Sequence, residues 1–264
     1  MLGIGGGLLM VPFLYLLMDG PSWSGVIVPV EHHAALAHAT SLAVIVPTAL
    51  SGLRAFHREG MVSWTLVLPL GGIAAFSALV GVQVAVALPS PLLKTLFGVF
   101  LVLMGGRLFL PQDRGSAGGA PAARRMRWWV VLVAGALVGF LSALLGVGGG
   151  VVAVPILIHW AGLDLHRVVP ASIGIILFAA PAGALGYVFA GSGTEGLPAG
   201  AIGFVHLPAA LAMLPGAILM APMGARWNRR MKVATLRVLF ALLLLLVGVR
   251  LVWENGPQAV GALG

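Results

Sequence analysis

The segment GVGGGVVAVP, residues 146–155, places four glycines inside a long apolar stretch. A near copy, GIGGGLLMVP at residues 3–12, opens the chain. Glycine in a helix interior costs about 1 kcal/mol relative to alanine, so three glycines in a row predict a helix break. In lipid such a break exposes backbone groups that no water satisfies, and it survives only where protein covers it or where it lines a cavity. Paired breaks in two halves of one chain are typical of transporters with a binding site near the membrane midplane.

The composition identifies an integral membrane protein. Of the 264 residues, 60% are hydrophobic and only 8% are charged, and the mean hydropathy is +1.07. Soluble domains carry roughly 25% charged residues. Long continuous apolar runs predict helices, whereas a β-barrel would alternate in polarity. The net charge of +8 is best explained by basic loops that orient membrane helices, not by nucleic-acid binding. The absence of cysteine excludes disulfides, thiolate catalysis and cysteine-bound metal.

The hydropathy pattern predicts an all-α membrane protein with about eight or nine transmembrane or half-membrane helices. The expected helical segments are residues 3–18, 34–56, 63–88, 92–110, 128–145, 151–161, 168–190, 199–224 and 233–253. Residues 1–110 form a first membrane repeat, 111–127 a basic, polar cytoplasmic linker, and 128–264 a second repeat. The helix expected at 128–145 has no counterpart before residue 3, so we expect the first repeat to lack its first helix.

An internal duplication extends beyond the glycines. From Gly3 to Gly146 and from Arg107 to Arg250 the offset is the same 143 residues, and the flanking residues also match. Between these points, the sequence ATSL at 39–42 resembles PASI at 170–173. Three matches in the same order indicate a repeat rather than chance.

The loop charges predict that the two repeats are inverted in the membrane. In the first repeat the loop after residues 39–42 is basic, with Arg54 and Arg58, and the later turn at 89–91 is uncharged. In the second repeat the early loop carries only Glu195, and the later loop carries Arg226, Arg229, Arg230 and Lys232. Because basic loops stay in the cytoplasm, the repeats have opposite orientations. The second break must then be either a re-entrant pair of half-helices or two short crossings.

The paired glycine motifs, the stretch HATSL at 38–42 and the two halves joined by a polar linker resemble the sulfite exporter TauE/SafE family, also called toluene-sulfonate uptake permeases. The resemblance covers nearly the whole chain except the missing first helix. It implies a multi-pass transporter of the cytoplasmic membrane for small sulfur-containing anions such as sulfite, sulfoacetate or other sulfonates.

An anionic substrate suits the chemistry of a glycine break. Free backbone N–H groups and the positive end of a half-helix attract anions, and side chains such as His38 and the hydroxyls of Thr40, Ser41 and Ser172 can donate hydrogen bonds. The glycines also have a purely structural interpretation as small residues for helix packing, and the hydroxyls can bond helix carbonyls instead. The expected substrate-binding residues are Gly5, Gly6, Gly7, His38, Thr40, Ser41, Gly148, Gly149, Gly150 and Ser172.

We expect no cofactor and no metal site, although Glu31, His32 and His33 superficially resemble one. All seven carboxylates fall in expected loops or at helix ends, so no acidic proton relay is predicted inside the membrane. Outward movement of one negative charge across about 100 mV yields about 2.3 kcal/mol, enough for a gradient of roughly fortyfold. Export therefore needs no coupling ion.

Other classes of function remain open from the sequence. An intramembrane enzyme would need a nucleophile and a base at membrane depth, and no such pairing follows from the spacing of Ser142, Ser172 and His206. A structural anchor would not need duplicated broken helices. An anion channel of other specificity would share the same fold. The expected partners are a small anion and the lipid bilayer, and the sequence leaves association with further copies of the chain open.

Overall fold

The structure is a computed structural model, and it describes residues 7–19, 28–109, 128–161, 165–217 and 233–261. The expected linker at 111–127 and the glycines Gly5 and Gly6 lie outside these residues. The described chain is almost entirely helical, which confirms the all-α fold class. Five of its helices are long and apolar enough to cross a membrane.

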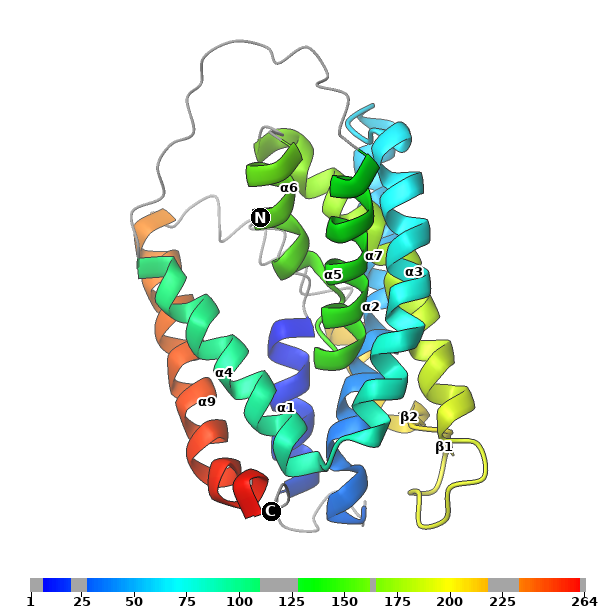
Figure 1. Cartoon of the computed structure of the whole chain (residues 1–264), viewed down its shortest axis with the longest axis vertical. Helices are drawn as coiled ribbons and strands as arrows, with labels where there is room; N and C mark the ends of the chain where they lie inside the picture. Colours follow the sequence, from blue (N-terminus) through cyan, green and yellow to red (C-terminus); the bar gives the residue numbers. More distant parts are fainter. Residues whose placement is uncertain (1–6, 20–27, 110–127, 162–164, 218–232, 262–264) are drawn as a thin grey trace.

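The helices follow the expected order (Figure 1). The first half contains α1 (Gly7–Asp19), the 3-10 turn η2 (Val30–His32), α2 (His33–Arg58), α3 (Trp64–Ala87) and α4 (Ser90–Phe109). The second half contains α5 (Trp128–Leu145), α6 (Gly150–Ala161), α7 (Leu165–Ala190), a short apolar helix at Leu207–Ala217 and α9 (Val233–Gly261).

Small residues let the helices of the central bundle approach one another closely. Helices α2, α3, α5 and α7 pack together. On α5, Gly139 lies so close to α3 that an added Cβ would overlap the backbone of Ala74. On α7, Gly174 faces Val67 of α3, at 2.7 Å from the position of an added Cβ. Such contacts are how membrane helices gain van der Waals packing where lipid supplies no hydrophobic drive.

Helices α4 and α9 form an antiparallel pair beside the bundle (Figure 1). A Cβ on Gly98 would lie 2.9 Å from the Gly248 carbonyl oxygen, and one on Gly248 would lie 2.8 Å from that of Gly98. About two turns further along α4, Gly105 faces Ala241 of α9. Gly98 and Ala241 are separated by the 143-residue repeat offset, and so are Gly105 and Gly248. The contact of Gly98 with Gly248 and the contact of Gly105 with Ala241 are therefore related by the repeat, because each joins the repeat counterparts of the residues in the other. The inversion of the complete halves stays a prediction.

One expected helix starts later than predicted. Residues 199–224 were expected to form a single membrane helix, but the strands β1 (Ala201–Ile202) and β2 (Val205–His206) form a short antiparallel hairpin there. The helix begins only at Leu207. Gly200 and Gly203 have positive φ, which side chains disfavour, so these glycines permit the turn. Phe204, Val205 and His206 are all buried because the hairpin docks on α2 and α7.

Candidate functional site

The second glycine motif breaks the chain between α5 and α6. Gly146, Gly148 and Gly149 all have positive φ, a conformation that costs other residues about 1–2 kcal/mol each. The Gly149 carbonyl accepts hydrogen bonds from the N–H groups of Val152 (3.1 Å) and Ala153 (2.7 Å), so it caps the start of α6. Helix α6 then runs back beside α5, toward the end of the molecule at which α5 begins (Figure 1).

The break is held against α2. The Ser41 hydroxyl donates a hydrogen bond of 2.8 Å to the Gly146 carbonyl. A Cβ on Gly146 would lie 2.6 Å from the His38 Cα, and one on Gly148 would lie 2.9 Å from the Ile45 side chain. Glycine is therefore needed at these positions for two reasons: the backbone has positive φ, and α2 approaches too closely for a side chain.

Two polar atoms at the break have no hydrogen-bond partner. Among the described residues, the buried side-chain atoms in this condition are His38 Nδ1 and Ser142 Oγ. Both side chains are fully buried. His38 lies against Gly146, and Ser142 lies against Gly149, with its Cβ 3.2 Å from the position of an added Cβ. Buried polar groups are nearly always paired, and an unpaired one indicates a role in binding or an unseen partner.

His38 is fixed by aromatic side chains from other helices. The hydroxyl oxygen of Tyr15 on α1 lies 2.6 Å from His38 Nε2. The Phe97 ring on α4 packs against both, edge-on to Tyr15 and tilted against His38. The Lys94 ammonium lies 5.3 Å from the centre of the Tyr15 ring, and Lys94 as a residue is 4% exposed. Helices α1, α2 and α4 thereby meet at this histidine.

The predicted binding residues separate into groups. Gly148 and Gly149 lie in the break, Gly150 begins α6, and His38 and Ser41 line the break from α2. The first-half motif is described only from Gly7, where α1 begins. The other two hydroxyls, of Thr40 and Ser172, make hydrogen bonds to groups outside the break. Thr40 Oγ1 accepts a hydrogen bond from the backbone N–H of His206 on the hairpin (3.0 Å). Ser172 donates to the carbonyl of Val169 in its own helix (2.9 Å).

Sequence reasoning missed Tyr15, Lys94 and the position of Ser142 at the break. Ser142 lies one helical turn before Gly146, a spacing that places it near the break of the same helix. No sequence pattern signals the contact of Tyr15 with His38, because it joins separate helices. Lys94 occupies the repeat position of Arg237, which marks it as a cation within an apolar span.

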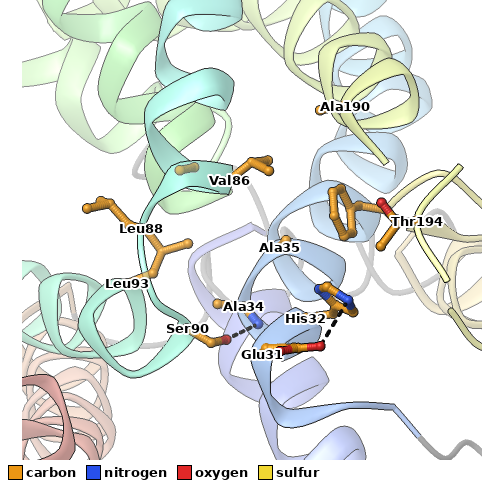
Figure 2. Close-up of a pocket in the computed structure, with 12 residues that line it drawn as sticks. Glu31, His32, Ala34, Ala35, Val86, Leu88, Ser90, Leu93, Ala190 and Thr194 are labelled. Atoms are coloured by element: carbon orange, nitrogen blue, oxygen red, sulfur yellow. Dashed lines mark hydrogen bonds and ion pairs between the residues drawn. The ribbon is translucent and has the colours of Figure 1, made fainter. Parts of the chain in front are cut away.

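A separate cavity of about 170 Å³ lies where the N-terminal end of α2 meets the α3–α4 turn and the hairpin region. Figure 2 shows Glu31, His32, Ser90 and Thr194 around it, with Ser90 accepting a hydrogen bond from the Ala34 N–H. The Glu31 carboxylate oxygen Oε1 lies 3.6 Å from His32 Nε2. A carboxylate on the wall opposes binding of an anion in this cavity. Within the described ranges, no group of three or more His, Cys, Asp or Glu residues is placed to hold a metal ion.

Comparisons with known proteins agree with a membrane transporter. The chain is 28% identical to a probable membrane transporter protein MJ0441 of Methanocaldococcus jannaschii, over 93% of this chain and 87% of that protein. It is 26% identical to the probable membrane transporter protein YunE of Bacillus subtilis, over 97% and 92%. It is 25% identical to a probable membrane transporter protein of Haemophilus influenzae, over 94% and 90%. No solved structure matches the chain. The family model described as sulfite exporter TauE/SafE matches residues 1–251, so this multi-pass membrane protein belongs to the TauE/SafE family of transporters.

Proposed function

We propose that the protein exports small sulfur-containing anions, such as sulfite, sulfoacetate or other organosulfonates, across the cytoplasmic membrane without catalysing a reaction. The observation that carries the proposal is the pair of unpartnered buried polar atoms at the break, His38 Nδ1 and Ser142 Oγ. They lie against Gly146 and Gly149 at the N-terminal end of α6. An oxyanion bound there would accept hydrogen bonds from these side chains, and the bonds would offset the free-energy cost of burying the polar groups.

The electrostatics of the break favour an anion. The first N–H groups of a helix have no intrahelical acceptor, and the helix dipole adds about half a positive charge at that end. Among the described residues, the buried polar side chains are histidines, hydroxyls and Lys94, and none is a carboxylate. A cationic substrate would therefore meet no compensating charge at this depth, whereas an anion is attracted.

The membrane potential supports export as the direction. Outward movement of one negative charge across about 100 mV, inside negative, releases about 2.3 kcal/mol. Uptake would cost the same amount and would need a coupling ion. Buried carboxylates are the usual proton carriers of coupled transporters, and the described buried residues contain none. The mechanism that needs no coupling ion is therefore uniport export driven by the membrane potential.

Efflux from proteoliposomes tests the proposal. Purified protein is reconstituted with labelled sulfite inside, and efflux is measured with an imposed inside-negative potential and without one. We expect faster efflux with the potential, and competition by sulfoacetate but not by a quaternary ammonium cation. Flux that absolutely required a proton gradient would contradict the uniport mechanism. The absence of any saturable flux of sulfur anions would contradict the proposed substrate class.

A Gly149→Leu variant tests the location of the site. The added side chain would project toward Val138 and Ser142, where a Cβ would already lie 3.0 Å from Val138. We expect efflux to be lost. The matched control is Gly72→Leu on α3, because a Cβ there meets nothing within 4 Å. Unchanged efflux in Gly149→Leu would mean that substrate does not pass the break.

A further inference from the structure

The contact between Tyr15 and His38 couples the phenol hydroxyl to the tautomer of the imidazole. The hydroxyl oxygen and Nε2 are 2.6 Å apart, and both side chains are buried. A phenol hydroxyl is a strong donor and an unprotonated imidazole nitrogen is a strong acceptor. A neutral imidazole has one N–H only, so donation by Tyr15 to Nε2 leaves the hydrogen on Nδ1.

The surroundings of Nδ1 favour the same tautomer. The backbone of Leu144, near the end of α5, approaches the His38 ring, although its carbonyl makes no hydrogen bond of acceptable geometry with Nδ1. A carbonyl oxygen attracts an N–H and repels a lone pair. A hydrogen on Nδ1 would face the region where α5 ends and the break begins.

We propose that Tyr15 is a positioning residue for substrate binding, because its hydroxyl holds His38 as the Nδ1–H tautomer and so supplies the break with a hydrogen-bond donor. The inference rests on the proposed function, since an anion requires a donor and a lone pair at Nδ1 would repel it. Tyr15 itself touches no substrate. It acts through His38, and its own orientation is held by the Phe97 ring, 6.0 Å away between centroids.

Tyr15→Phe removes the hydroxyl and keeps the aromatic ring that packs on Phe97. In this variant Nε2 loses its donor, and the hydrogen is free to occupy either nitrogen. We expect the KM for sulfite efflux to rise about fivefold or more, as for the loss of a hydrogen bond, with a smaller change in the maximal rate. Tyr187→Phe is the matched control, because it deletes another buried phenol hydroxyl, which donates to the Ala143 carbonyl (3.1 Å).

Nitrogen NMR of the full chain in lipid nanodiscs reads the tautomer directly. With ¹⁵N-labelled histidine, the His38 signals are assigned by their loss in His38→Gln. The wild type should show a protonated Nδ1 and an acceptor Nε2, Tyr187→Phe should show the same pattern, and Tyr15→Phe should show a mixture of tautomers. A wild-type protein with its hydrogen on Nε2 would overturn the proposal.

A double-mutant cycle separates positioning from packing. His38→Asn keeps an amide donor close to the former position of Nδ1 and has no tautomers. If Tyr15 acts through the tautomer, Tyr15→Phe should raise KM in the wild-type background and leave it unchanged in His38→Asn. An equal effect in both backgrounds would show a packing role and overturn the inference. If the wild type moves no sulfur anion, the proposed function fails, and the NMR result still decides the tautomer.

Discussion

Ser41 on α2 donates its hydroxyl hydrogen to the carbonyl oxygen of Gly146, across 2.8 Å and between residues 105 positions apart in the chain. Gly146 directly follows α5, where the carbonyls at a helix end have no partner within the helix. Without water, an unpaired carbonyl in the bundle would carry its full desolvation cost. One hydroxyl from a neighbouring helix therefore lets the break remain buried.

Ser41→Ala should destabilise the protein. The variant leaves the Gly146 carbonyl without its partner, at a cost of about 1–3 kcal/mol in the free energy of unfolding. Unfolding by denaturant in mixed micelles measures this change. The matched control is Thr48→Ala in the same helix, whose hydroxyl bonds only the carbonyls of Val44 and Ile45 one turn before it, and which should change stability by less than about 0.5 kcal/mol. Unaltered stability of Ser41→Ala together with a raised KM would instead assign Ser41 to direct substrate binding.

Three glycine variants should separate the cost of backbone conformation from the cost of contact. Gly60→Ala changes a residue with positive φ and open space around its Cβ position, so it should cost about 1–2 kcal/mol. Gly146→Ala combines positive φ with a Cβ 2.6 Å from the His38 Cα, and we expect about 2–5 kcal/mol. Gly72→Ala has neither problem and should be neutral or up to about 1 kcal/mol more stable.

Unfolding midpoints of the three purified variants measure this order. Equal losses for Gly146→Ala and Gly60→Ala would mean that the contact between the break and α2 contributes nothing. A loss in Gly72→Ala as large as that in Gly146→Ala would mean that these glycines respond to a general effect of substitution.

The sequence predicted the break and the helices well because each is a local property. Three adjacent glycines raise the cost of a helix wherever they occur, and long apolar runs cross lipid regardless of their neighbours. The contact of Tyr15 with His38 depends on how separate helices are rotated against one another, which no local pattern encodes. The hairpin at 201–206 was missed because a buried, apolar hairpin has the hydropathy of a membrane helix. The sequence signal for the hairpin was the high frequency of glycine at residues 191–203. Several of these glycines have positive φ in the structure.

Gly98→Ala and Gly248→Ala should each loosen the pair of α4 and α9. Each added Cβ would lie 2.8–2.9 Å from the opposing carbonyl oxygen, closer than the roughly 3.3–3.6 Å of ordinary Cα–H···O contacts. We expect each variant to cost about 1–3 kcal/mol. Because the first substitution already separates the helices, the double variant should cost less than the sum. Gly106→Ala, with open space at its Cβ, is the control, and fully additive losses would mean that the two glycines do not share one contact.

Cysteine labelling should detect the predicted inversion of the repeats. Glu59 follows α2 and Glu195 follows α7; both are exposed, and the two helices end at opposite ends of the molecule (Figure 1). The chain contains no cysteine, so Glu59→Cys and Glu195→Cys each introduce a single thiol. Because Arg54 and Arg58 mark the cytoplasmic end of α2, an impermeant maleimide should label Glu195→Cys in intact cells and Glu59→Cys only after lysis. The cysteine-free parent should show no labelling. Labelling of both variants from the same side would refute the inversion, whereas exchanged sides would preserve the fold and reverse the orientation assigned from the basic loops.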